Sequence, residues 1–322
     1  MAKKPYRKKK DNEELEDALD LGPGSIPLGG TGSMEELMAT LGALLEEQDF
    51  ESIDEANAFL DQLVRSGEPL TPSEPRTPLE EAQALIYEAF ETGSSRKRIS
   101  LARKALSISE DCADAYVLLA DEKAKTVEEA KAFYEAGVQA GERALGEDAF
   151  EEYEGHFWGV LKTRPYMRAR AGLAACLWEM GERGEAIAHY QEMLRLNPGD
   201  NQGLRYTLLH CLLEDRRDKD AEKLLKRYQG DPTAAWQYNA ALLAFRKGGA
   251  SRRANSQLAQ ALRHNPHVPD YLLGKRRMPR EIPEYIQFGD ETEAVDYVDI
   301  SGPLWLQEPG ALDWLRQAAS AT

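Results

Sequence analysis

The sequence predicts an all-α protein: a right-handed α-solenoid of about five stacked helix pairs, with an N-terminal helical hairpin and an irregular C-terminal cap. Apolar residues recur at helical spacing almost without a break over residues 79–266. Within that span, an arrangement of small and large apolar residues repeats with a period near 34 residues. Glycine and proline concentrate near the N-terminus and after residue 263, which predicts less regular ends around a helical middle.

The N-terminal third divides into three predicted segments. Residues 1–32 are basic, then acidic, then rich in Gly, Pro and Ser, and they predict a disordered tail because they offer little apolar area to bury. Residues 33–66 contain two Ser-x-x-Glu capping signals, each followed by apolar residues at helical spacing, and predict a small helical hairpin. Residues 67–78 are rich in proline and predict a linker.

The repeat is clearest in residues 167–198. Ala174 and Ala186 are small enough to let two antiparallel helices approach closely, and Tyr190 would fill the space between them. Gly181 would end the first helix and Pro198 the second. This segment resembles the 34-residue tetratricopeptide pattern, with Arg170 where a large aromatic residue is common.

The same phase extends in both directions and predicts five helix pairs within residues 79–266. An insertion at residues 141–163 separates the second pair from the third. Residues 267–322 would cap the array, with short helices near 291–297 and 311–319. The apolar positions that define the other four pairs are Leu85 and Ala102, Leu119 and Tyr134, Leu208 and Leu225, and Trp236 and Leu258. Stacked pairs of this kind form a superhelix whose concave groove binds extended peptides or single helices.

Several longer segments add a family resemblance to this repeat. They are residues 155–159 (GHFWG), 163–168 (TRPYMR), 197–203 (NPGDNQG) and 267–274 (HVPDYLLG). Together they resemble bacterial tetratricopeptide-containing proteins grouped with the suppression-of-tumorigenicity-seven family, over roughly residues 80–300. The resemblance implies the helical-repeat fold and carries no defined activity and no catalytic residues.

Charge and cysteine content indicate a cytoplasmic protein that does not bind nucleic acid or membrane. The first ten residues carry six basic side chains, which leaves 34 of the 40 basic residues against 56 acidic ones in the rest of a chain of net charge −16. Such a body repels phosphate backbones. No apolar run is long enough to span a membrane. Cys112, Cys176 and Cys211 are widely spaced in apolar helical contexts and predict buried, reduced thiols.

Residue patterns for catalysis or metal binding are weak, so we expect no enzymatic activity, cofactor or metal. Cys176 and Cys211 fall where a helix pair needs small apolar residues, and His210 would point away from its neighbour Cys211. His264 and His267 bracket a proline that ends the helix, and they lack a third ligand. His264 is instead expected near a helix C-terminus, where the helix dipole favours it.

The candidate binding residues lie at the start of the third and fourth pairs and in the fifth. Arg168 and Arg205 occupy first-helix positions that commonly line the groove, where an arginine binds a carboxylate through two parallel hydrogen bonds. This resembles part of the carboxylate clamp of some tetratricopeptide proteins, although the lysine and asparagine positions of that clamp are not matched. The predicted partner contacts are Arg168, Asn201, Gln202, Arg205, Tyr206 and Trp236.

A second interpretation of these arginines is internal. Arg164 and Arg168 would then pair with Glu151, Glu152 or Glu179, and Trp158 would anchor the insertion in the core.

The sequence thus favours a scaffold that binds a protein or peptide, with a carboxylate of the partner as the candidate contact of the arginines. Alternatives are a self-assembling structural protein, an accessory module of an enzyme using the insertion, and nucleic-acid contact through the basic residues 3–10.

Overall fold

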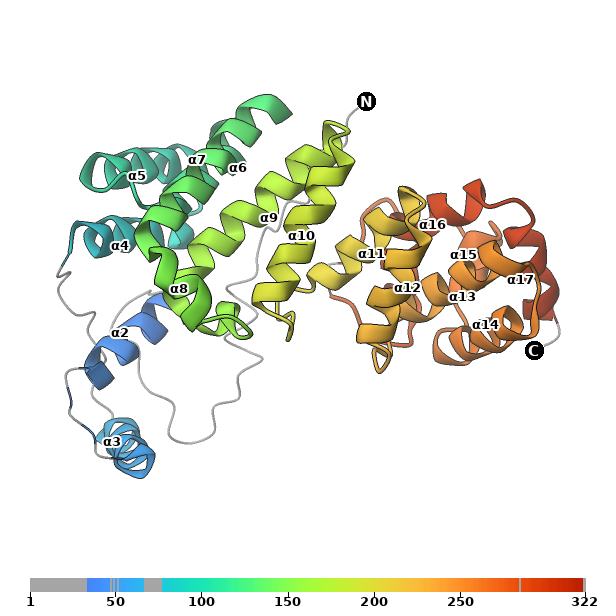
Figure 1. Cartoon of the computed structure of the whole chain (residues 1–322), viewed down its shortest axis with the longest axis horizontal. Coiled ribbons are helices and arrows are strands. Elements are labelled where there is room, and N and C mark those ends of the chain that lie inside the picture. Colours follow the sequence, from blue (N-terminus) through green and yellow to red (C-terminus); the bar gives the residue numbers. More distant parts are fainter. Residues whose placement is uncertain are drawn as a thin grey trace. The chain divides into compact units, whose positions relative to one another are not determined.

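The computed structural model describes residues 34–46, 48, 50, 52–66, 77–283 and 285–320. The predicted tail of residues 1–32 and all but the last two residues of the predicted linker lie outside the described residues. Every regular element within the described ranges is helical, as predicted. The chain divides into two compact units, Met1–Met180 (unit 1) and Gly181–Thr322 (unit 2), which we treat separately (Figure 1).

Unit 1 is built on five long helices that pack in sequence order. Helix α4 pairs with α5, α6 pairs with α7, and α9 packs against both α7 and α6. Three shorter segments, α8, η1 and η2, precede α9, and two described helices precede α4. The bounds are α2 Met34–Glu46, α3 Ile53–Ser66, α4 Pro78–Glu91, α5 Ser95–Ile108, α6 Ala113–Lys123, α7 Val127–Leu145, α8 Glu147–Glu152, η1 Phe157–Gly159, η2 Leu161–Thr163 and α9 Arg164–Glu179.

Small residues explain why these helices lie so close together. Ala82, Ala89, Ala102 and Ala105 are fully buried where α4 meets α5. On α9, Gly172 lies under the ring of Tyr134, where an added Cβ would come within 2.1 Å of the ring. Short side chains at these positions let helix backbones approach and bury apolar area on both sides.

Unit 2 contains two further pairs and a C-terminal group of helices. Helix α11 pairs with α12 and α13 pairs with α14, while α10 packs against α11. Thr233 and Ser251 cap the N-termini of α13 and α14 through their side-chain oxygens. The bounds are α10 Arg183–Leu196, α11 Leu204–Glu214, α12 Asp218–Arg227, α13 Ala234–Gly248, α14 Arg252–His264, α15 Val268–Leu272, α16 Glu291–Gln307 and α17 Ala311–Ser320.

Four of the five predicted pairs form within a unit. The two helices of the third pair, at residues 167–198, lie on either side of the division, with α9 in unit 1 and α10 in unit 2. Within its own unit, α9 packs on α6 and α7, and α10 packs on α11.

Helices α2, α16 and α17, which lie before and after the predicted pairs, pack onto helices of the pairs in their own unit, and α16 is longer than expected. Helix α2 contacts α4 and η2. Helix α16 is far longer than the expected helix at 291–297 and continues through Pro303. It packs against α15, α13 and α11, whereas α17 packs against α14 and α15. Helix α16 therefore covers the first helices of the fourth and fifth pairs rather than the end of the array.

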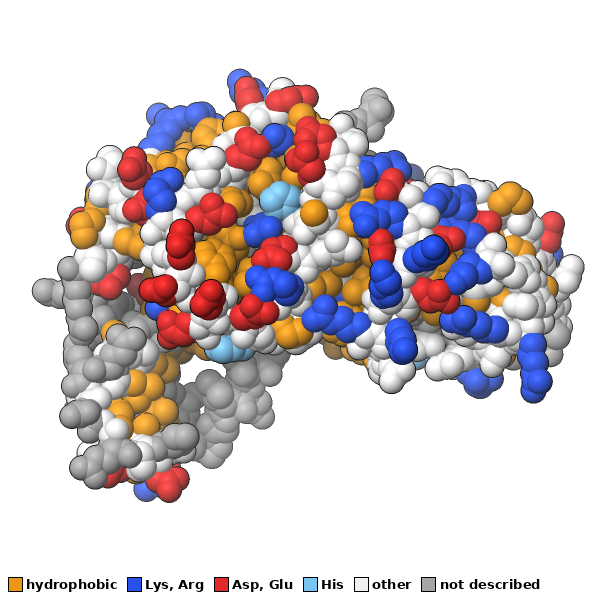
Figure 2. All heavy atoms as spheres, in the orientation of Figure 1, with side chains coloured by type: hydrophobic (Ala, Val, Ile, Leu, Met, Phe, Trp, Pro, Cys, Tyr) orange, Lys and Arg blue, Asp and Glu red, His pale blue; other side chains and the backbone are white. Residues whose placement is uncertain are grey.

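The net negative charge is unevenly distributed on the surface. Figure 2 shows lysine and arginine side chains gathered on one face of unit 2, over α11 to α14. Ion pairs offset part of this charge: Lys223 pairs with Asp220, while Lys247 and Arg253 share Glu222. Exposed pairs of this kind contribute little to stability.

Candidate functional site

A pair of arginines one turn apart on α9, Arg164 and Arg168, forms the centre of the candidate site in unit 1. The insertion shapes the surroundings of Arg164. Thr163 is fully buried and donates its hydroxyl to the carbonyl oxygens of Phe157 and Val160, which holds η1 and η2 against the start of α9. The carbonyl oxygen of Trp158 then accepts a hydrogen bond of 3.0 Å from Arg164 Nε.

One edge of the Arg168 guanidinium is used by the fold. Its Nε and Nη2 donate to the two carboxylate oxygens of Asp114 at 2.7 and 2.5 Å. Asp114 lies in the first turn of α6 and is fully buried, and Gln83 of α4 also donates to it at 3.0 Å. Arg168 therefore neutralises a carboxylate that has no access to water.

The other edge of Arg168 faces a carboxylate from outside the repeat pairs. Nη1 of Arg168 donates to both oxygens of Glu35 on α2, at 2.9 and 3.1 Å. Nη1 of Arg164 donates to the same carboxylate at 3.2 Å. The three side chains are 14–22% exposed, so water screens these contacts only partly.

Aromatic rings surround the two guanidinium groups. Arg164 lies over the ring of Trp158 at 5.3 Å, and Arg168 lies 6.0 Å from the rings of Trp158 and Phe90. Burial disfavours the charge on Arg168, but the carboxylates of Asp114 and Glu35 outweigh this and raise its pKa. Two guanidinium groups thus face two carboxylates, the buried Asp114 and Glu35 of α2, so that without Glu35 the site lacks one negative charge.

The expected internal partners of these arginines were wrong. Arg164 and Arg168 pair with Glu35 and Asp114, not with Glu151, Glu152 or Glu179. Trp158 is also not the residue that anchors the insertion in the core. The fully buried ring is that of its neighbour Phe157, which stacks on Phe150 and packs edge-on against Tyr166.

The other five predicted contact residues belong to unit 2, whereas Arg168 belongs to unit 1. Arg205 is enclosed by its own chain: Nη1 contacts Asp200 at 2.9 Å and Nε contacts Asp231 at 2.7 Å. Tyr206 accepts from Arg205 and donates to Asp231. The ring of Trp236 is 2% exposed and packs edge-on against Tyr206.

Asn201 and Gln202 belong to the loop before α11. Asn201 is exposed and accepts a 3.4 Å hydrogen bond from Asn197, while Gln202 is half-buried. Asp200 adopts a left-handed conformation in this loop, with φ of 49°, so that its carboxylate accepts the backbone N–H groups of Leu204 and Arg205. The loop therefore caps α11 and positions Arg205.

The Asp231 carboxylate stabilises the Arg205 cluster electrostatically. Burial opposes its ionisation, but hydrogen bonds from Thr233, Arg205 and Tyr206 outweigh burial and lower its pKa. Because Asp200 and Asp231 both contact Arg205, its charge is already balanced from two sides.

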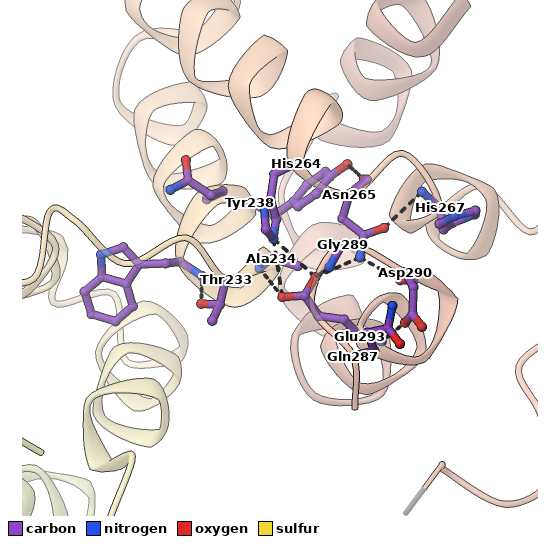
Figure 3. Close-up of polar contacts among 12 residues, drawn as sticks. Thr233, Ala234, Tyr238, His264, Asn265, His267, Gln287, Gly289, Asp290 and Glu293 are labelled. Atoms are coloured by element: carbon purple, nitrogen blue, oxygen red, sulfur yellow. Dashed lines mark hydrogen bonds and ion pairs between the residues drawn. The ribbon is translucent and has the colours of Figure 1, made fainter. Parts of the chain in front are cut away.

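Sequence reasoning missed a polar cluster around Glu293, which anchors the start of α16 (Figure 3). The Glu293 side chain is 5% exposed and accepts from Ala234 N, Gly289 N and Asn265 Nδ2, at 2.8, 2.8 and 2.9 Å. His264, in the last turn of α14 as expected, lies 3.3 Å away. A carboxylate on the first N–H of α13 complements the positive end of that helix.

Cys112, Cys176 and Cys211 are buried and free. Burial raises the pKa of Cys112 and Cys211 to about 12 and that of Cys176 to about 11, so all three free thiols stay protonated near neutrality. Within the described ranges, His, Cys, Asp and Glu side chains do not gather in threes suited to a metal. None of the helices in the described part combines the length and the apolar character needed to cross a membrane.

Comparison with known proteins places the chain in a family. The ST7 protein family matches residues 76–320. Suppressor of tumorigenicity 7 protein-like from Rattus norvegicus is 29% identical over 262 residues, which cover 74% of this chain and 46% of the relative. The ST7 homolog of Caenorhabditis elegans is 30% identical over 273 residues, which cover 72% and 49%. The chain thus spans about half the length of the curated relatives it matches.

Among solved structures, YrrB, described as a tetratricopeptide repeat protein with an unusual peptide-binding site, aligns with a TM-score of 0.41 and 19% identity. The alignment covers 64% of this chain and 91% of that one. Because the family match extends over most of the sequence and over nearly every helix from α4 to α17, the chain belongs to the ST7 protein family.

Proposed function

We propose that the protein is a non-catalytic scaffold for protein–protein interaction, in which Arg164 and Arg168 bind a carboxylate of a partner peptide or protein. The observation that supports this is that the two edges of the Arg168 guanidinium bind different carboxylates. One edge of its guanidinium is committed to the buried Asp114, and the other edge joins Arg164 in holding a carboxylate that the repeat pairs do not supply. Two arginines converging on one carboxylate give geometric selectivity as well as charge.

Unit 1 is favoured over unit 2 as the location of this site. Arg205 already contacts Asp200 and Asp231 of its own chain. The first helices of unit 2, α11 and α13, are also covered by α16, whereas the carboxylate shared by the two arginines of unit 1 comes from α2. We therefore propose Arg164 and Arg168 as partner contacts and assign Arg205, Tyr206 and Trp236 a structural role.

Arg164 is the residue that tests this proposal, because its loss leaves Asp114 compensated. The probe is a fluorescein-labelled peptide with the sequence of residues 34–46, titrated into the full chain and followed by fluorescence anisotropy. Because Glu35 of the chain itself contacts both arginines, the variants are compared in a Glu35→Lys background that leaves the site open to the probe. In that background we expect Arg164→Met to weaken binding about fivefold or more, as loss of a charged hydrogen bond does. The matched control is Arg96→Met, an exposed arginine of unit 1 on α5. Equal affinities for the two variants would contradict the proposal.

Self-association is the alternative function, because α2 of a second copy would present the same carboxylate to the site. Analytical ultracentrifugation over micromolar concentrations separates self-association from binding of a different partner: a dimer lost in Arg164→Met would favour self-assembly.

We also propose a cytoplasmic location, supported by three buried free thiols. The bacterial origin suggested by the sequence resemblance stays a prediction.

A further inference from the structure

Two helices from outside the predicted pairs lie on the first helices of the pairs, one in each unit. In unit 1, α2 contacts α4 and places Glu35 against α9. In unit 2, α16 contacts α11 and α13. The two helices differ sharply in how firmly they are held.

Helix α16 is built into its unit. Eight of its residues are buried, among them Tyr297 and Trp305. Tyr297 donates to Asn239 of α13 at 3.0 Å and accepts from Trp305 at 2.7 Å. Glu293 holds the first turn of the helix, and Glu308, directly after it, pairs with Arg246 of α13 at 2.7 Å. Removing α16 would expose large apolar surface and leave buried polar groups without partners.

Helix α2 is held much more weakly. Thr40 is the one buried residue among its described side chains, and Met34 and Met38 are 47% and 41% exposed. The contacts of Glu35 with the two arginines are its polar anchor. Thirty-one residues separate Glu46 from Pro78, enough chain to let α2 leave while it stays tethered. A helix with few buried contacts is the kind that opens locally at low cost.

We infer that the face of unit 1 formed by α4, η2 and the start of α9 docks an amphipathic helix of a partner protein, and that α2 is the chain's own occupant of this face. The inference rests on the proposed function of Arg164 and Arg168. The partner helix carries a carboxylate in its first turn, as α2 does at Glu35 and Glu36, followed by Leu and Met at helical spacing. It binds by displacing α2.

Competition from a tethered helix has a measurable consequence. When a segment of the same chain occupies a site, a free ligand binds only to the molecules in which the site is open. The apparent affinity is then the intrinsic affinity multiplied by the fraction of open molecules. Weakening α2 should therefore strengthen binding of a helix in trans. Reversing the charge at Glu35 opposes Arg164 and Arg168 directly, because a lysine there faces two guanidinium groups.

The test titrates the peptide of residues 34–46 into the full wild-type chain and into Glu35→Lys. We expect Glu35→Lys to bind the peptide about tenfold more tightly, within the usual range of coupling between two sites. The control is Asp54→Lys, an equal charge change at an exposed position on α3, which should leave the affinity near that of the wild type. If Glu35→Lys binds no more tightly than this control, α2 does not compete and the inference is overturned.

Hydrogen exchange supplies a second measurement, on the wild-type chain itself. Amides of α2 should exchange faster when the added peptide is bound, because α2 has been displaced. Binding without any change in α2 would overturn the inference while leaving the role of Arg164 intact. If instead the wild-type chain forms a dimer that the peptide dissociates, the face belongs to a second copy and the separate partner is excluded.

Discussion

Arg168→Met should destabilise unit 1 strongly, because it leaves Asp114 without its cation. The Asp114 side chain is fully buried, and Arg168 supplies two of the three hydrogen bonds that it accepts from side chains, with Gln83 supplying the third. Breaking a buried ion pair from one side costs about 3–5 kcal/mol, since the remaining charge cannot reach water. Arg168 is 22% exposed, which places the expected loss near the lower limit, at about 3 kcal/mol.

The measurement is urea unfolding of the full chain, with hydrogen exchange of α6 and α9 used to assign the transition to unit 1. A loss of about 3 kcal/mol corresponds to a fall of about 1.5 M in the urea midpoint, for a slope of about 2 kcal/mol/M. Asp114→Asn in the Arg168→Met background removes the stranded charge and should restore most of the loss. Arg164→Met, which leaves the Asp114 pair intact, should cost about 1 kcal/mol or less.

Two outcomes would refute this reasoning. If Arg168→Met shifts the midpoint no more than Arg164→Met, Asp114 does not depend on its ion pair. If the double variant is no more stable than Arg168→Met alone, the loss comes from packing of the arginine side chain and not from the buried charge.

Three further predictions concern packing, the Glu293 cluster and the thiols. Gly172→Ala should lower the stability of unit 1 by about 1–3 kcal/mol, because the new methyl group meets the ring of Tyr134; an unchanged thermal midpoint would contradict the close approach. Glu293→Gln should cost about 2 kcal/mol in urea unfolding, because a neutral amide is a weaker acceptor for the N–H groups of Ala234 and Gly289, with exposed Glu281→Gln as the control that should change little. At pH 8 the thiols of native Cys112, Cys176 and Cys211 should react with iodoacetamide far more slowly than they do in urea. Their raised pKa values keep them protonated until the pH approaches about 11–12. Equal rates in the two conditions, measured by mass spectrometry, would show that the thiols are exposed.

Helix positions were largely predictable because the signals that define them are local. Ala102 and Ala186 lie on buried faces where the repeat phase placed them, and all ten helices of the predicted pairs are present. The division of the helices between two units could not be predicted from these local signals. Nothing in residues 167–198 indicates that α9 and α10 belong to different units, because the repeat pattern continues through the division.

The site was predicted in part. The repeat phase identified Arg168, but its partners Asp114 and Glu35 lie 54 and 133 residues away, a separation at which local sequence carries no signal for a contact. Helix α16 extends well beyond the predicted end at residue 297 and continues through Pro303. Proline lacks the backbone N–H of a helical hydrogen bond and usually ends or kinks a helix, yet here the tertiary contacts of Tyr297 and Trp305 carry the helix past it.

The position of α16 also bears on how unit 2 is made. Helices α11 and α13 leave the ribosome well before residues 291–307 have been synthesised, so their covered faces stay bare during that interval. Tyr238 and Asn239 would then be accessible to chaperones and to other nascent chains. Folding of unit 2 thus depends on synthesis of α16, and a chain terminated before Glu291 should be cleared by quality control rather than accumulate.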